Sequence, residues 1–193
     1  MQLTRPAPMH RYLASAALAG VGGAMAMAMV AMVASVTYQH HGLFTPVFHI
    51  AALFGSAKAM TTSAHEAMLG HRFWFTPGAA ATGLLVHVMA GVFYGLVFAA
   101  VAPIVPRRAM IPAGMLFGLA VFGLSAFVDL PAAAAVTGAG SVIGHMARIV
   151  GYPTFAVEHV VFGAVTAGLF RWRTTSTAPD DRRSPAGRAT LAA

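Results

Sequence analysis

The sequence predicts an all-α membrane protein with four transmembrane helices and a short interfacial helix on the outer face. The first observation behind this prediction is composition: 58% of the 193 residues are hydrophobic and 9% are charged, against roughly 45–50% and about 25% in soluble domains. The second is the presence of four long apolar runs, since a span of the hydrocarbon core needs about 20 mainly apolar residues. The third is the distribution of Lys and Arg along the chain.

The first span follows a short basic lead. Residues 1–12 form that cytoplasmic lead, and the apolar run at 13–38 is far longer than the roughly 7–15 apolar residues of a signal peptide, so we expect a retained anchor. The outer segment 39–78 contains an apolar patch that is too short to cross a bilayer. We therefore expect an interfacial or re-entrant helix near 46–58.

Three further spans complete the predicted domain. The second covers 79–105 and ends at a cytoplasmic turn, 106–108. The third covers 109–130, where Pro131 is expected to end the helix. An outer loop, 131–151, leads to the fourth span at 152–170.

The distribution of Lys and Arg predicts the orientation, because both accumulate in cytoplasmic flanks. With four spans and a cytoplasmic N-terminus, nine of them fall inside and three outside, whereas a fifth span near 46–58 would leave five inside and seven outside. Both termini are therefore expected in the cytoplasm, and the Ser-, Thr-, Pro- and Arg-rich stretch 171–193 reads as a disordered tail. The inside residues are Arg5, Arg11, Arg107, Arg108, Arg171, Arg173, Arg182, Arg183 and Arg188, and the outside residues are Lys58, Arg72 and Arg148.

Small residues indicate how the helices pack, since close approach of backbones holds membrane helices together. Gly91 and Gly95 form one G-x-x-x-G pattern and Gly114 and Gly118 form another, while Gly163 clears one side of the fourth span. These glycines favour a tight bundle or a dimer and do not choose between the two. The partners that this reading allows are the lipid bilayer, further copies of this chain as a homo-oligomer, and another membrane protein.

Methionines in the first span allow two interpretations. Met25, Met29 and Met32 share one helix face, and thioethers are soft ligands for Cu(I). Methionine is also a flexible apolar filler. Copper binding and packing therefore both remain open for this face.

Four ionisable side chains lie inside the predicted spans: His87, Asp129, Glu158 and His159. Such residues are costly in a bilayer, by roughly 2.5–3.5 kcal/mol for an acid at its centre, and each is a functional hypothesis by default. His87 and His159 both lie about eight residues, or roughly 12 Å, from the outer end of their helix. Asp129 lies where the third span reaches the same side.

The two intramembrane histidines share a pattern. His87-x-x-x-Gly91 and His159-x-x-x-Gly163 each place a glycine on the same helix face as the imidazole. The leading interpretation is a non-enzymatic membrane protein of unknown role, in which each histidine hydrogen-bonds to a neighbouring helix and the glycine allows close contact.

Two alternatives give the polar residues a ligand. A b-type haem electron-transfer subunit needs two neutral imidazoles on different helices at one depth. An outer-facing divalent-metal or proton site, related to transport, would combine titratable imidazoles with carboxylates. That site would use His87, His159, Glu158 and Asp129, with His40 and His41 as its entry.

Composition and motifs exclude several classes of function. The chain has no cysteine, which rules out disulfides, thiolate metal sites, iron–sulfur clusters and covalently attached haem. The net charge of +7 is spread over the flanks of the spans, so no nucleic-acid partner is expected. The sequence contains no nucleophile motif, glycine-rich phosphate loop or H-E-x-x-H pattern, and no catalytic residue is predicted.

Several short segments together resemble a family of small, uncharacterised bacterial membrane proteins with four spans and paired H-x-x-x-G motifs. The resemblance lies in the run 44–55 (FTPVFHIAALFG), in 83–91 (GLLVHVMAG), in 129–131 (DLP) and in 159–163 (HVVFG), and it covers about residues 15–170. It implies the four-span topology in a bacterial plasma membrane and carries over no catalytic roles.

Overall fold

The computed structural model describes residues 8–176, and no strand occurs among them. Four helical runs are long and apolar enough to cross a membrane: Met9–Thr37, Pro77–Ile104, Arg107–Thr137 and Tyr152–Thr175. The prediction of an all-helical chain with four candidate spans is confirmed.

Three of the four runs are essentially single helices, and the third is composite. The long helices are α1 (Met9–Thr37), α4 (Pro77–Val101) and α9 (Tyr152–Ser176), and the composite run joins α5 (Met110–Leu124), the π-helical turn η3 (Ser125–Asp129) and α6 (Leu130–Thr137). Two short turns, η1 (Ala102–Ile104) and η2 (Arg107–Ala109), connect α4 to α5. Short helices form the other end: α2 (Thr45–Ala51), α3 (Lys58–Met68), α7 (Gly140–Gly144) and α8 (Met146–Val150).

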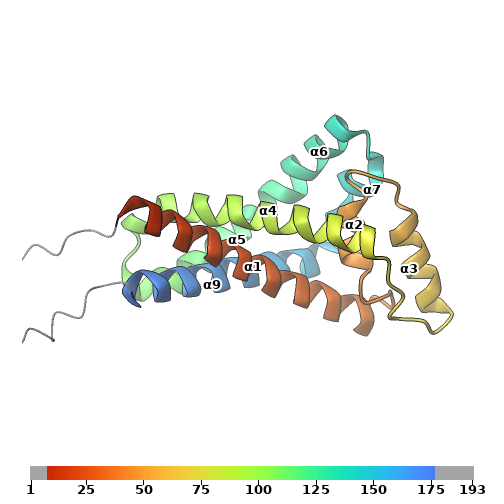
Figure 1. Cartoon of the computed structure of the whole chain (residues 1–193), viewed down its shortest axis with the longest axis horizontal. Helices are drawn as coiled ribbons and strands as arrows, with labels where there is room; N and C mark the ends of the chain where they lie inside the picture. Colours follow the sequence, from red (N-terminus) through yellow and green to blue (C-terminus); the bar gives the residue numbers. More distant parts are fainter. Residues whose placement is uncertain (1–7, 177–193) are drawn as a thin grey trace, which may run out of the picture.

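The bundle therefore has two distinct ends (Figure 1). We call the end with α2, α3, α6 and α7 the cap end, and the end at which α1 begins and α9 finishes the terminal end. Helix α1 packs along α4 and α9, and α5 packs along α9, whereas α4 and α5 make few contacts with each other. The fold thus consists of two helix pairs, α1–α4 and α5–α9, joined mainly through α1 and α9.

The third run extends beyond its predicted end at residue 130. Proline has no amide hydrogen and its ring clashes with the carbonyl one turn earlier, which is why Pro131 predicts a helix end. The structure widens the turn instead: the amide of Leu130 donates to the carbonyl of Ser125, five residues earlier. The helix then continues as α6 to Thr137, and α7 and α8 occupy much of the predicted outer loop.

Backbone contact through glycine defines the α1–α4 pair. Gly91 and Gly95 of α4 lie against Gly20 of α1, and a Cβ on any of the three would overlap backbone or Cβ atoms of the other helix. Close approach of this kind maximises van der Waals contact where lipid supplies no hydrophobic force between helices.

The α5–α9 pair uses the same device. A Cβ on Gly114 would overlap the carbonyl oxygen of Gly163, and a Cβ on Gly118 would overlap the carbonyl oxygen of His159. The glycine that follows each H-x-x-x-G histidine thus contacts a different partner: α1 for Gly91 and α5 for Gly163.

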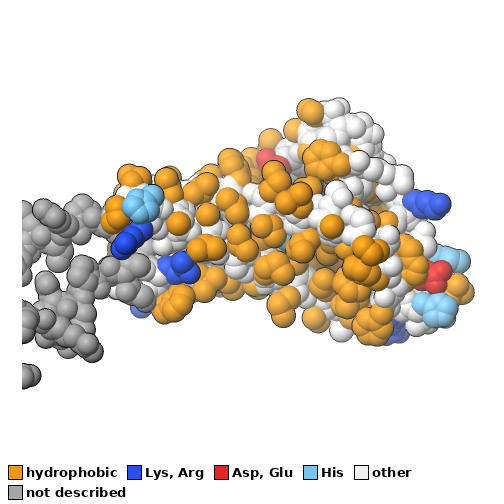
Figure 2. Space-filling view, viewed as in Figure 1, with side chains coloured by type: hydrophobic (Ala, Val, Ile, Leu, Met, Phe, Trp, Pro, Cys, Tyr) orange, Lys and Arg blue, Asp and Glu red, His pale blue; other side chains and the backbone are white. Residues whose placement is uncertain are grey.

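Large apolar side chains cover the outside of the long helices. Val33, Phe93 and Leu116 are each more than half exposed, and Figure 2 shows hydrophobic side chains along the middle of the molecule, with the visible Lys, Arg and His side chains toward its two ends. A band of this kind matches a hydrocarbon layer between two polar interfaces.

The segment expected to hold one helix near 46–58 contains two. Helix α2 ends at Ala51 and α3 begins at Lys58. Helix α2 packs against α4 and α1, with Phe48 and His49 almost completely buried. His49 Nε2 donates to the carbonyl of Val142 at 2.7 Å, which ties α2 to α7 and closes the cap end over the bundle.

Candidate functional site

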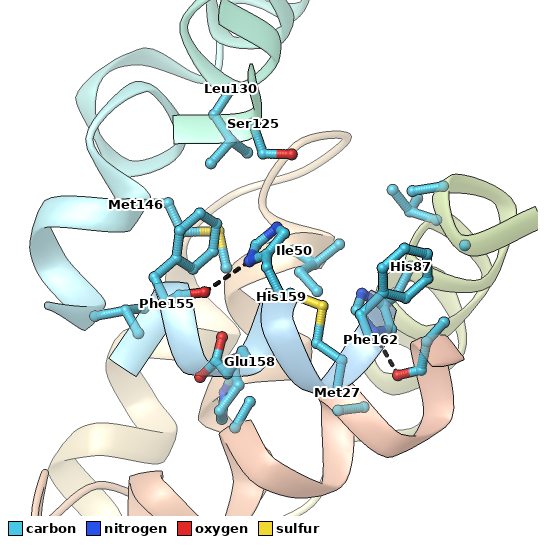
Figure 3. A pocket seen from close by; sticks show the side chains of 18 of the residues that line it. Met27, Ile50, His87, Ser125, Leu130, Met146, Phe155, Glu158, His159 and Phe162 are labelled. Atoms are coloured by element: carbon cyan, nitrogen blue, oxygen red, sulfur yellow. Dashed lines mark hydrogen bonds between the residues drawn. The ribbon is translucent and has the colours of Figure 1, made fainter. Parts of the chain in front are cut away.

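A cavity of about 250 Å³ lies between the two helix pairs, near the cap end. Its walls come from α1, α2, α4, the α5–α6 run, α7, α8 and α9. All four ionisable residues that the sequence places inside the spans line it: His87, Asp129, Glu158 and His159. Residues more than 70 positions apart in the chain are therefore gathered around one space (Figure 3).

Glu158 is the least satisfied polar group of the cavity wall. The residue is 3% exposed, its Oε1 atom is completely buried without a hydrogen-bond partner, and no described residue donates to its carboxyl. Figure 3 shows Glu158 and His159 on different sides of α9, as the roughly 100° step between successive helical residues requires. An unpaired buried carboxyl costs several kcal/mol, which makes this side chain the strongest functional candidate.

His87 is held by the neighbouring helix. Its Nε2 atom lies 2.9 Å from the carbonyl oxygen of Ala24 on α1. A carbonyl oxygen carries no hydrogen, so the ring nitrogen donates, and Nδ1 of the neutral ring is left as an acceptor. This bond crosses the α1–α4 pair one turn from the Gly91 contact.

His159 is held by its own helix. Its Nδ1 donates to the carbonyl of Phe155, four residues earlier, at 2.7 Å, and its ring packs edge-on against Phe155 and Phe122. The expectation of a bond to a neighbouring helix therefore does not hold for this histidine. Its Nε2 has no partner among the described residues and remains an acceptor on the cavity wall.

Asp129 closes the π-helical turn and is bonded across the cavity. The hydroxyl of Tyr94 on α4 donates to Asp129 Oδ2, and Ser125 Oγ lies 3.5 Å from the same oxygen, at the limit of a hydrogen bond. Tyr94 and Ser125 also line the cavity. This bond is the main polar link between α4 and the composite third run.

The remaining wall is mostly apolar and is open on one side. On α9, Phe155 and Phe162 are buried, and Met27 and Ile50 contribute from α1 and α2. On α4, by contrast, the lining residue Leu84 is 40% exposed. Helix α4 also makes few contacts with α5. The open side therefore lies along α4, on the flank of the bundle.

The other predicted site residues lie elsewhere. His40 and His41 do not line the cavity; His40 is exposed in the turn after α1, and the amide of His41 donates to the carbonyl of Ser35 at 2.8 Å. Met25 and Met29 are 40% and 65% exposed, so the face that they share on α1 points largely outward. Among the methionines of α1, Met27 is the residue that lines the cavity.

The described residues give limited support to the metal and haem alternatives. Within residues 8–176, no group of three or more His, Asp or Glu side chains lies close enough to hold a metal ion. The cavity volume of about 250 Å³ also lies below the roughly 300–1,000 Å³ of typical cofactor sites.

Two contributors to the site have only a weak sequence signal. Tyr94 is a single hydroxyl in an apolar run and gains its role from its position opposite Asp129. Gln39 lines the cavity and donates to the carbonyl of Val150 at 3.0 Å, yet it follows the end of the first apolar run.

No family model, curated protein or solved structure matches this chain.

Proposed function

We propose that this chain is a non-enzymatic, multi-pass protein of the bacterial plasma membrane whose cavity binds a small organic amine in its protonated form. The single observation that carries the proposal is the Glu158 carboxyl, which lines the cavity, is 3% exposed and has no donor among the described residues. Buried charges in proteins are paired, and an ammonium group in the cavity supplies the missing partner.

The other polar atoms of the cavity support a ligand that donates. Asp129 already accepts a hydrogen bond from Tyr94. In His87 and His159 one ring N–H donates to a carbonyl oxygen, so the other ring nitrogen of each is an acceptor. A primary ammonium has three donors and no acceptor. It therefore matches a wall whose unsatisfied groups all accept.

Cavity size limits the ligand to about one ring. An apolar protein cavity of about 150 Å³ holds a benzene molecule, so about 250 Å³ accommodates a benzyl- or phenethylamine-sized molecule. The aromatic rings of Phe155 and Phe162 provide apolar contact for its hydrocarbon part.

The orientation of the bundle is part of the proposal. The described basic residues at the terminal end are Arg11, Arg107, Arg108, Arg171 and Arg173, against Lys58, Arg72 and Arg148 at the cap end. This bias supports a cytoplasmic terminal end. The burial of α2 against α4 supports a re-entrant helix at the outer face. We also propose that the chain belongs to the bacterial four-span family with paired H-x-x-x-G motifs.

The test is binding of para-fluorobenzylamine to the protein in lipid nanodiscs, followed by fluorine NMR. Para-fluorobenzyl alcohol, which has nearly the same shape and no charge, is the matched ligand. We expect the amine to bind and Glu158→Gln to weaken it by about 30-fold or more, because loss of one partner of a buried charge pair costs 2 kcal/mol or more.

Glu66→Gln is the matched control, since Glu66 pairs with His71 on the surface at 2.8 Å and does not line the cavity. This variant should bind the amine as the wild type does. Equal binding of amine and alcohol, or unchanged amine binding in Glu158→Gln, would contradict the proposal.

A further inference from the structure

A second cavity, of about 310 Å³, lies at the terminal end of the bundle, far from Glu158 along α9. Its lining combines two guanidinium groups with an apolar floor, and its residues are Arg11, Tyr12, Ser15, Ala102, Pro103, Val105, Arg107, Met110, Phe170 and Thr174. None of these residues lines the first cavity.

Two separate segments deliver the positive charges. Arg11 lies in the first turn of α1, and Arg107 begins η2, the connection between α4 and α5. Both side chains are exposed, and neither has an ion-pair partner among residues 8–176. Figure 2 shows basic side chains on this end of the molecule. The fold thus places two guanidinium groups, neither paired with a described carboxylate, on the rim of one cavity.

Two of the three hydroxyl-bearing residues of the cavity, Tyr12 and Thr174, already use their hydroxyl groups as donors. Tyr12 donates to the carbonyl of Ala99 at 2.7 Å, and Thr174 donates to the carbonyl of Phe170 at 2.9 Å. Arg11 and Arg107 are the charged donors of this lining, and guanidinium groups bind phosphate oxygens in pairs of parallel hydrogen bonds.

Below the arginines the cavity is apolar. Met110, Phe170 and Ala102 are buried and belong to the core cluster at this end of the bundle, and Tyr12 packs edge-on against Phe170 with ring centroids 5.2 Å apart. A free inorganic anion gains nothing from such a floor, whereas the glycerol and upper acyl chain of a lipid do.

We propose that this cavity binds one anionic phospholipid, with its phosphate between Arg11 and Arg107 and the adjoining hydrocarbon on Met110 and Phe170. The position suits such a ligand, because the cavity lies where the four apolar runs end and therefore at the level of lipid headgroups. Bound lipid would bridge the first turn of α1 to the α4–α5 connection.

The test is native mass spectrometry of the full chain released from detergent after incubation with phosphatidylglycerol or phosphatidylcholine. We expect one retained phosphatidylglycerol and little phosphatidylcholine. The double variant R11Q/R107Q should lower retention by roughly 30-fold, since each basic residue near a membrane surface contributes on the order of a factor of five.

The double variant R108Q/R171Q is the matched control, because it also removes two exposed positive charges at the terminal end, and neither Arg108 nor Arg171 lines the cavity. It should retain phosphatidylglycerol as the wild type does. A loss of phosphatidylglycerol in R108Q/R171Q equal to that in R11Q/R107Q would overturn the proposal in favour of unspecific charge attraction, and so would equal retention of the two lipids by the wild type. Displacement of the lipid by millimolar inorganic phosphate would overturn it in favour of a free-anion site. Circular dichroism of each variant confirms that the exposed arginines were replaced without unfolding.

Discussion

The burial of a single histidine makes the stability of the cap end depend on pH. His49 is 3% exposed and donates to Val142. Burial lowers its pKa below the ordinary value of 6.5, the bond to the Val142 carbonyl opposes that shift, and the charge of nearby His41 adds to it. The unfolded chain therefore binds a proton at a higher pH than the folded chain does.

The contribution of His49 to the free energy of unfolding should consequently be constant above the ordinary histidine pKa and should fall as the pH drops through it. The fall amounts to up to about 1.4 kcal/mol for each unit between the pKa of His49 in the unfolded chain and its pKa in the folded chain. His49→Gln keeps a donor for Val142 and removes the titration, so its pH slope between about pH 7.5 and pH 5 should be shallower. Unfolding curves in detergent, followed by circular dichroism, measure the slope.

His65→Gln provides the comparison, because His65 is exposed on α3. This variant should keep the wild-type slope. A His49→Gln slope equal to that of the wild type would refute the assignment of the acid sensitivity to this residue.

Single residues also mark the limit of sequence-based prediction. His87, Asp129, Glu158 and His159 are identifiable because ionisable groups in apolar runs are costly, and the structure brings all four to one cavity. Which of them lacks a partner is decided by tertiary contacts. The sequence gives equal weight to Asp129 and Glu158, yet only Asp129 has a Tyr hydroxyl opposite it.

At the scale of helices, backbone contact at glycine sets the geometry of the α5–α9 pair. Gly118→Ala should destabilise the protein by about 1–3 kcal/mol, as added methyl groups do in packed cores, because the new Cβ overlaps the carbonyl oxygen of His159. Gly123→Ala on the same helix should be neutral or stabilising, since no atom lies within 4 Å of its Cβ position and alanine is the better helix former.

Unfolding of both variants by titration with SDS in mixed micelles compares them directly. Equal stability of Gly118→Ala and Gly123→Ala would contradict the close contact between α5 and α9.

Helix boundaries show why some elements escape sequence rules. Hydropathy finds the four spans because length and composition alone decide whether a segment can cross a bilayer. It misses the continuation through Pro131, since the wider turn at Ser125–Asp129 depends on the packing around it. It also misses α3, whose residues (KAMTTSAHEAM) form no apolar run.

At the scale of the whole molecule, the absence of cysteine from the chain makes the proposed orientation directly testable. A single cysteine introduced as Ser56→Cys lies in the exposed turn between α2 and α3, and Thr175→Cys lies at the end of α9. With a cytoplasmic terminal end, a membrane-impermeant maleimide added to intact cells that expose the periplasm should label the first and spare the second.

Permeabilised cells serve as the control and should show labelling at both positions. Labelling of Thr175→Cys alone in intact cells would reverse the proposed orientation. Labelling of both positions would contradict the placement of the cap end and the end of α9 on opposite sides of the membrane.

The open side of the first cavity lies along α4, on the flank of helices that lipid surrounds in a bilayer. A molecule reaching Glu158 by that route dissolves in the acyl chains first. The concentration that governs occupancy is then its concentration in the membrane, so apparent affinities measured in water should rise with each ligand's lipid–water partition coefficient. Within a series of amines of equal fit, the most lipophilic member would saturate the protein at the lowest dose, and adding empty vesicles would weaken every one of them by dilution into lipid.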